Sequence, residues 1–269
     1  MWPVLVMGVG SLEVTITPIE DEEAHGLSGL SRAPDGSLWT VSERQRPRLI
    51  RLTEDGTAVQ QRLPVTRTPW GYDLESVDWL DDDLLIFGTE HPVRGKASVL
   101  LATWEGNRVK VARTWPAGWG GLNGEIALNR GFEGICAGGG LIAVASETPM
   151  ETSKGAVAPV YLIDQSNLDW YRPVVDETVY LPLPEGGTIS ALSCGPGEQV
   201  SAIVRGRSME GAMRGILRYT VGAKQVEYFP LGEVLAPHNL EGLIADEGGW
   251  QAISDAKSGE AVWVDIRLR

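Results

Sequence analysis

The chain is poor in the residues and motifs that mark several common classes of protein. Its 269 residues include only 3 histidines and 2 cysteines, and no GxSxG sequence occurs. Without that nucleophile turn, a serine hydrolase of the α/β type is not expected. No HxH or HxxxH spacing occurs either, which weakens a zinc site built from histidines. No run of 18 apolar residues is present, so we expect no membrane span.

Positive charge is also scarce. The chain has 23 Lys and Arg against 36 Asp and Glu, a formal net charge of −13 and a pI near 4.7. Nucleic acids and anionic membranes need a basic surface, so neither is an expected partner. We expect a monomer that binds a small molecule. The apolar residues 1–10 lack the charged start of a signal peptide, and the sequence leaves the cellular location open.

The sequence shows no long helical periodicity, but it does contain a short repeated phrase. The chain has 33 glycines and 16 prolines, and no window keeps an i, i+3, i+4, i+7 apolar pattern for three turns. A four-residue phrase instead recurs at 27–30, 74–77, 132–135, 189–192 and 240–243. A second signal follows the centre of each phrase after 14 or 15 residues, at 43, 90, 147, 205 and 255.

Two signals that stay in step at this spacing predict a repeat architecture. Each unit contains short β-type stretches separated by turn residues, which is typical of a β-propeller. We therefore expect an all-β fold, a five-bladed β-propeller with four-stranded blades, as a single domain over 1–269. The units are expected at about 25–65, 72–117, 131–184, 188–231 and 239–266. The last unit lacks a fourth strand, and residues 12–18 are predicted to complete it and close the ring.

The two cysteines lie at matching places in neighbouring units. Cys136 and Cys194 both follow the repeated phrase. A disulfide needs Cα atoms within about 7 Å. Because we expect the inner strands of adjacent blades to diverge, we predict two buried free thiols.

The two signals predict two rings of side chains at one mouth of the channel. The first ring contains Ser28, Glu75, Glu133, Ser190 and Glu241, and the second contains Glu43, Glu90, Glu147, Arg205 and Asp255. Carboxylates this close repel one another unless a positive charge intervenes. Calcium suits such oxygen ligands best, with Mg²⁺ or Zn²⁺ as alternatives. The predicted metal ligands are Glu43, Glu75, Glu90, Glu133, Glu147, Glu241 and Asp255. The alternative is that they brace the blades by pairing with arginines or backbone N–H groups.

All three histidines map to the same mouth. His25 and His238 lie two residues before the phrase in units one and five, and His91 follows the second signal of unit two. We predict that His25 or His238 acts as a general base and that Arg205 holds a negative oxygen. The alternative is that the histidines satisfy backbone groups in loops. Long Gly-rich connections at 117–130 and 148–157 are expected at this face and would furnish a ligand pocket.

Four segments carry a resemblance to a known family. HGLSGLSRAPDGSLWTVSER, DLESVDWLDDDLLIFGTE, GFEGICAGGGLIAVASE and NLEGLIADEGGWQAISD resemble the phytase-like family described as esterase-like activity of phytase. The resemblance implies a propeller, often exported, with an acidic channel suited to calcium and with ester or phosphoester hydrolase activity. Ser28, Ser190 and Arg205 depart from the acidic pattern. A metal is therefore expected off the axis, toward units two, three and five.

These expectations combine into one predicted function and two alternatives. The predicted function is a metal-dependent hydrolase, with calcium as the expected ion, acting on phosphoesters or carboxylic esters at the mouth. The first alternative is a non-catalytic ligand-binding propeller. The second is a metal-dependent lactonase or lyase, because fold alone does not fix chemistry.

Overall fold

The computed structural model describes most of the chain. The described residues are 4–8, 11–21, 24, 26–42, 47–69, 71–122, 126–128, 130–168, 171–184, 186–208, 211–256 and 260–269. Within them, helix is confined to two 3₁₀ turns, η1 (Gln165–Asn167) and η2 (Glu233–Leu235). None of the described helices is long and apolar enough to cross a membrane.

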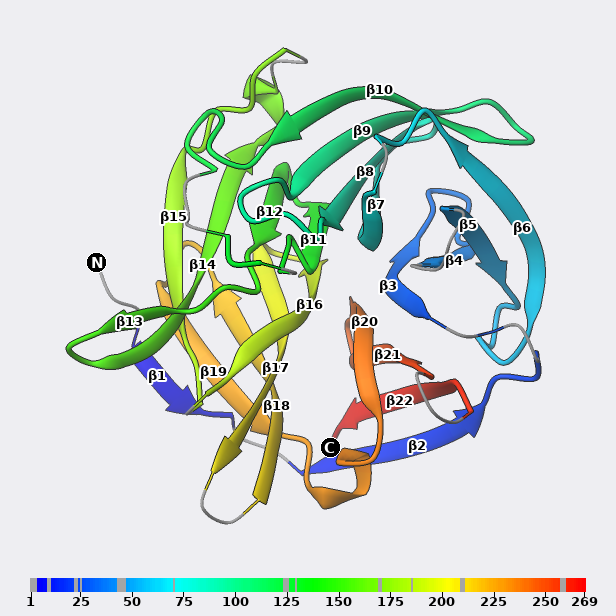
Figure 1. The fold of residues 1–269 in the computed structure, drawn as a ribbon. Coiled ribbons are helices and arrows are strands. Elements are labelled where there is room, and N and C mark those ends of the chain that lie inside the picture. The colour runs from blue at the N-terminus through cyan, green and yellow to red at the C-terminus, as the bar shows by residue number, and fades with distance from the viewer. Residues whose placement is uncertain are drawn as a thin grey trace.

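The strands form antiparallel sets that follow one another around a centre (Figure 1). Set 1 contains β3 (Leu27–Arg32), β4 (Leu38–Ser42), β5 (Arg48–Leu52) and β6 (Val59–Thr66). Set 2 contains β7 (Asp73–Asp81), β8 (Leu84–Glu90), β9 (Ser98–Trp104) and β10 (Val109–Pro116). A short parallel contact between β6 and β10 joins these two sets into one eight-stranded sheet.

Sets 3 and 4 carry additions that the repeats do not predict, whereas set 5 does not. Set 3 contains β11 (Gly134–Gly138), β12 (Leu141–Ala145), β14 (Gly155–Asp164) and β15 (Glu177–Pro182), with β13 (Met150–Thr152) paired to β14. Set 4 contains β16 (Thr188–Gly195), β17 (Gln199–Ser208), β18 (Gly211–Thr220) and β19 (Gln225–Pro230), and β1 (Val4–Met7) pairs with β19 in parallel. Set 5 contains β20 (Asn239–Asp246), β21 (Gly249–Asp255), β22 (Val262–Leu268) and β2 (Leu12–Pro18).

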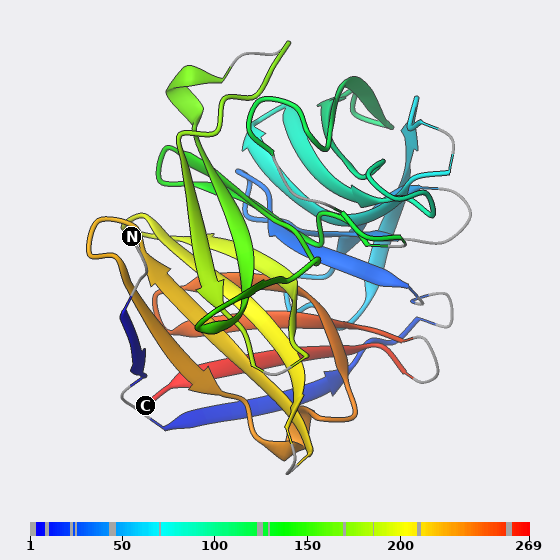
Figure 2. The ribbon, with the colours of Figure 1, turned by 60° about the vertical axis from the view of Figure 1, so that its left-hand side comes forward.

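Strand β2 completes the last set, as the sequence predicts for residues 12–18. Each residue of β2 from Leu12 to Pro18 pairs antiparallel with one residue of β22. Figure 2 shows blue β2 running beside red β22, so the two ends of the chain share one sheet. The first strands also contact one another in a closed cycle, β3 to β7, β11, β16, β20 and back to β3.

The hydrophobic core lies between neighbouring sets. Each of the buried clusters draws its residues from two adjacent sets; for example, Leu49 of set 1 packs with Phe87 of set 2. Trp263 of set 5 packs with Ile50 of set 1, which closes the cycle of clusters. Burying apolar area at these junctions holds the sets together.

Crowding near the axis explains why the third residue of the repeated phrase is small. Gly29 has φ +61°, and a Cβ there would lie 2.6 Å from the Cα of Ser76 on β7. A Cβ on Gly242 of β20 would lie 2.8 Å from the backbone carbon of Gly29. The phrase therefore marks the point where the inner strands come closest.

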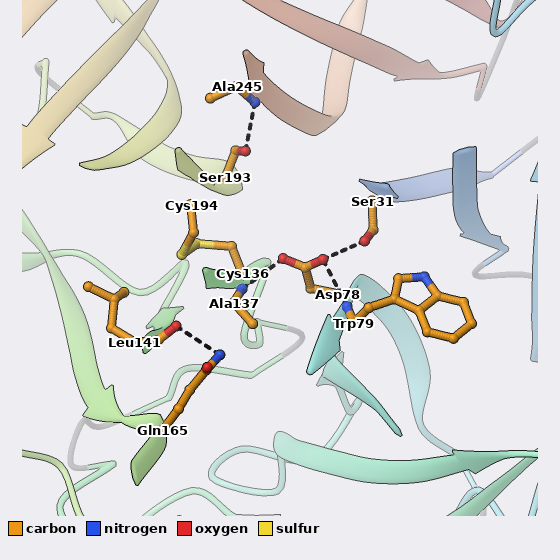
Figure 3. The surroundings of a disulfide bond; sticks show 10 residues. All are labelled: Ser31, Asp78, Trp79, Cys136, Ala137, Leu141, Gln165, Ser193, Cys194 and Ala245. Atoms are coloured by element: carbon orange, nitrogen blue, oxygen red, sulfur yellow. Dashed lines mark hydrogen bonds between the residues drawn. A yellow bond between two sulfur atoms is a disulfide. The ribbon is translucent and has the colours of Figure 1, made fainter. Parts of the chain in front are cut away.

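Cys136 and Cys194 form a disulfide, so the prediction of free thiols is wrong. Their Cα atoms lie 5.3 Å apart, because β11 and β16 run close together instead of diverging. The bond joins the residue directly after the phrase on β11 to a residue two positions after the phrase on β16 (Figure 3).

Asp78 occupies the same region and ties three inner strands together. Its carboxylate accepts hydrogen bonds from the Ser31 hydroxyl on β3 and, at 2.7 Å, from the Ala137 amide on β11 (Figure 3). Burial raises the pKa of Asp78 to about 6 despite these bonds. The disulfide and Asp78 together fasten the inner strands just beyond the phrase.

Candidate functional site

Bulges in the inner strands set the direction of the first-ring side chains. The pairing of β7 skips a residue between Leu74 and Ser76, and the pairing of β20 skips one between Leu240 and Gly242. The residues left over are Glu75 and Glu241. Strand β16 has the same irregularity at Ser190, and β3 has one a residue later, at Gly29. A bulge re-aims a side chain out of the regular alternation, so in four of the five units the repeated phrase contains a bulge.

Glu133 is the electrostatic centre of the mouth. It precedes β11 and is 5% exposed. Burial raises its pKa well above the usual range, and the nearby charges of Glu147, Glu241 and Glu90 raise it further. Arg205 acts in the opposite direction but does not cancel the effect. The structure thus brings predicted ligands from sets 2, 3 and 5 around one buried carboxyl.

The backbone explains this convergence. The Phe132 amide donates to the Thr89 carbonyl at 3.1 Å, and the Glu147 amide donates to the Gly131 carbonyl at 3.0 Å. The segment before Glu133 is therefore hydrogen-bonded on one side to the end of β8 and on the other to the end of β12. These bonds hold Glu133 between Glu90 and Glu147.

Arg205 serves as an internal counter-charge. Its Nη1 lies 2.7 Å from Glu241 Oε1, and its Nη2 lies 3.4 Å from Glu147 Oε1. Nη1 also donates to Asn239 Oδ1 at 2.6 Å, and Nε donates to Thr188 Oγ1 at 3.3 Å. The guanidinium is thus already bound by carboxylates, whereas the sequence predicts that it meets a substrate anion.

Removing this guanidinium should weaken the fold. We expect Arg205→Met to lower the free energy of unfolding by about 2–3 kcal/mol, because the Glu241 carboxylate is 3% exposed and loses its charged donor. Urea denaturation at pH 7 measures the change. Arg218→Met, which breaks the more exposed pair with Glu227, is the matched control and should cost less than about 1 kcal/mol. Equal losses in both variants would contradict a special role for Arg205.

Other members of the rings act partly as braces. Ser28 Oγ donates to the Glu75 carbonyl at 2.6 Å, and Ser190 Oγ donates to the Leu240 carbonyl at 2.7 Å. Each serine thus joins its set to the next. Asp255, 5% exposed, accepts the Gly26 amide at 3.1 Å and links set 5 to set 1. Glu43 lies outside the described residues.

The histidines differ in their surroundings. His91 is buried, its Nδ1 accepts the Val93 amide at 3.0 Å, and its ring lies 4.8 Å from Tyr72. His91 therefore stabilises the conformation of the loop that follows β8. His238 follows η2 and is half-buried; burial, and then the charge of Arg214, lower its pKa. His25 lies outside the described residues.

The donor set suits a hard cation in its chemistry. Carboxylate oxygens are what Ca²⁺ prefers, and the raised pKa of Glu133 indicates a carboxyl whose charge is not fully compensated. Within the described part of the chain, however, no three Asp, Glu, His or Cys side chains are arranged as a ready ligand set. Glu75, Glu133 and Glu241 would therefore have to rearrange to hold a cation together.

Sequence reasoning missed several polar residues of the mouth. Asn239, next to the repeated phrase, donates to Glu241 Oε1 at 2.5 Å as well as accepting from Arg205. Arg130 lies 3.7 Å from Glu147 and donates to its carbonyl at 3.2 Å. Asn239 carries a usable signal, since it directly precedes the phrase. Arg130 comes from a connecting loop and has no repeat to mark it.

Comparisons with known proteins bear on the fold. No family model and no curated protein matches the sequence, so the resemblance to the phytase-like family gains no support. A glycosyl hydrolase from Bacteroides ovatus superposes with a TM-score of 0.55 at 12% identity, covering 96% of this chain and 94% of that one. The PQQ-bound aldose sugar dehydrogenase from Streptomyces coelicolor gives 0.52 at 10% identity, covering 96% and 99%.

The soluble aldose sugar dehydrogenase from Escherichia coli gives a TM-score of 0.51 at 11% identity, covering 94% of this chain and 99% of that one. Identity this low carries over the fold and not the activity. The structural neighbours are β-propeller enzymes, and this chain is an all-β protein with a propeller fold.

Proposed function

We propose that the mouth around Glu133 is the active site of a divalent-cation-dependent hydrolase of phosphoesters or carboxylic esters, with calcium as the cation. The observation that carries the proposal is the buried Glu133 carboxyl set among Glu90, Glu147 and Glu241. Such a cluster gains stability when a proton or a cation joins it. Perturbed carboxyls of this kind gather at functional sites.

The cation, when bound, would polarise the phosphoryl or carbonyl oxygen and acidify a water molecule. Glu133, Glu75 and Glu241 would supply its oxygen ligands, which requires Arg205 to give up Glu241. The released guanidinium would then meet negative charge on the substrate. His238, whose lowered pKa keeps it neutral near pH 7, would take the proton from the water.

We also infer that the propeller has five blades. Sets 1 to 5 each contain four strands that pair in the order of a blade, and β1 and β13 are additions at the outside. The closed cycle of β3, β7, β11, β16 and β20 supports this count. Five inner strands leave a narrow channel, which concentrates the carboxylates at its mouth.

A turnover panel tests the proposal. Purified protein, stripped with EDTA and then given Ca²⁺, Mg²⁺ or Zn²⁺, is assayed on aryl phosphates, aryl carboxylic esters and lactones. The proposal expects hydrolysis of the phosphate or the carboxylic ester that is lost with EDTA and restored by Ca²⁺. Turnover confined to lactones favours the lactonase alternative. Absence of all turnover with metal present contradicts an enzyme and favours a binding propeller.

His238 should matter for rate more than for stability. We expect His238→Ala to lower kcat about 10²-fold while the metal stays bound, because the base is lost and the ligands remain. His238→Gln controls for hydrogen bonding. Since the pKa of His238 is lowered, the wild-type rate should decline with falling pH only below the range in which an ordinary histidine titrates. Full activity in His238→Ala would make this histidine structural.

A second candidate function rests on the same carboxyl without a cation. Glu133, with its raised pKa, would be a proton donor, while Glu241 and Glu147 are ion-paired with Arg205. Two carboxyls whose environments push their pKa values apart form the acid–base pair of many hydrolases, glycosidases included. The structural neighbour from Bacteroides ovatus is itself a glycosyl hydrolase. EDTA-resistant cleavage of aryl glycosides would select this candidate over the first.

A further inference from the structure

A pocket of about 510 Å³ lies beside the mouth, on set 3. Its lining includes Ser146, Thr148, Met150, Tyr161, Thr178 and Tyr180. Ser146 and Thr148 flank Glu147 in the chain, and Glu147 is one of the carboxylates whose charge acts on Glu133. Strands β13, β14 and β15 contribute residues to its walls, together with Gly121 and residues 146–149.

Tyr161 is the residue of the pocket lining whose polar group is left unsatisfied. Tyr161 is 2% exposed, and its hydroxyl has no hydrogen-bond partner among the described residues. A buried polar group in this state weakens the fold. Burial, and then the nearby Tyr180, raise the pKa of Tyr161 to about 12, so the group remains a donor at neutral pH. A wall residue of the pocket thus carries a buried donor that lacks an acceptor from the described chain and that a ligand would reach by a small movement of the lining.

The other polar groups of the pocket are also hydroxyls. Ser146 Oγ accepts the Thr148 amide at 3.2 Å, and Thr148 Oγ1 accepts the Ala127 amide at 3.1 Å. Each therefore keeps its own O–H as a donor. Thr178 adds another hydroxyl, opposite Tyr161 in the β14–β15 pairing. Pro149, Pro159 and Met150 supply apolar surface.

The lining also discriminates by charge. No lysine or arginine is among the described residues that line the pocket, and Glu151 is its one charged side chain. A phosphate-rich ligand would meet no positive charge there and one negative charge. A neutral ligand with many hydroxyls would instead meet alternating donors, acceptors and apolar surface.

We propose that this pocket binds a neutral sugar or polyol, as the part of the substrate next to the bond that is cleaved. The inference rests on the proposed function for its link to the mouth, and it narrows the substrate class to esters or glycosides of neutral carbohydrates. On this proposal, the Tyr161 hydroxyl donates a hydrogen bond to a hydroxyl oxygen of the sugar or polyol. The charge of the lining disfavours a multiply phosphorylated inositol.

The test measures binding without turnover. A Glu133→Gln protein is titrated with methyl α-glucoside, maltose, myo-inositol and myo-inositol hexakisphosphate, followed by saturation-transfer NMR. At least one neutral probe should bind, and the hexakisphosphate should bind more weakly. Adding Tyr161→Phe should raise Kd at least about tenfold, the effect of one lost hydrogen bond, with an unchanged or higher Tm. Thr178→Val should weaken the same probe.

Tyr219→Phe is the matched control, because Tyr219 is a buried tyrosine of set 4, away from the pocket. It should leave Kd unchanged. The inference is overturned if no neutral probe binds, if hexakisphosphate binds tighter, or if Tyr161→Phe and Thr178→Val both bind like the parent. Because Glu133→Gln removes turnover from the experiment, these results stand whether or not the mouth proves to be hydrolytic.

Discussion

Glu133→Gln is expected to lower kcat/KM about 10³–10⁴-fold, the largest effect of any single change considered. Glutamine keeps the size of the side chain but carries neither the proton nor the negative charge. Either form of chemistry at the mouth, through a cation or through a donated proton, therefore fails. Glu227→Gln, at an ion pair on set 4, is the matched control and should retain wild-type activity. Near-normal turnover in Glu133→Gln would remove the mouth as the active site.

The same substitution should change how stability depends on pH. The pKa of Glu133 is raised in the folded state, so its contribution to stability is complete below the unfolded pKa of about 4.5. That contribution is lost as pH rises toward the folded pKa, because ionisation then favours the unfolded chain. In metal-free protein, Glu133→Gln should therefore be more stable than wild type at pH 7, with the difference shrinking toward pH 4. A constant difference would contradict the raised pKa.

Breaking the disulfide should have the largest effect on stability. The double variant Cys136→Ser, Cys194→Ser is expected to lose roughly 4 kcal/mol of unfolding free energy, since the bond closes a loop of 58 residues in the unfolded chain. Urea denaturation with and without a thiol reductant measures it. Reductant should shift the wild-type midpoint and leave the double variant unchanged. Two titratable thiols in the unreduced native protein would contradict the bond.

The repeat in the sequence predicts much of the fold because it marks a local irregularity of the backbone, the bulge in the inner strands. The phrase around Glu75 and Glu241 encodes a bulge at the closest approach of the inner strands, and each inner strand begins within two residues of the phrase. The pairing of β2 with β22 follows from counting strands in the last unit. Both inferences need only period and composition.

The disulfide and the pocket could not be predicted in the same way. Whether Cys136 and Cys194 meet depends on the distance between two inner strands, which the small residues of the phrase control through packing. The pocket of Tyr161 depends on β13, an added strand without a counterpart in the other sets. Neither feature repeats, so neither leaves a periodic signal.

The site shows the same division between periodic and non-periodic features. The alignment of repeats predicts that Glu133, Glu147 and Glu241 lie near one another, and in the structure the charges of the last two raise the pKa of Glu133. The alignment does not predict that Arg205 pairs with two of them, because pairing depends on side-chain reach across sets 3, 4 and 5. From the sequence alone, an arginine in an acidic ring is equally consistent with a residue that binds substrate and with one that neutralises neighbouring carboxylates.

Metal content tests the central proposal most directly. Protein purified in Ca²⁺, dialysed and analysed for elements should carry about one Ca²⁺ per chain, and Glu133→Gln should carry none. EDTA should lower the Tm of the wild type, and Ca²⁺ at a hundred times its Kd should restore about 2.7 kcal/mol of stability. No bound metal, together with a Tm that neither EDTA nor Ca²⁺ changes, would contradict a cation-dependent mouth.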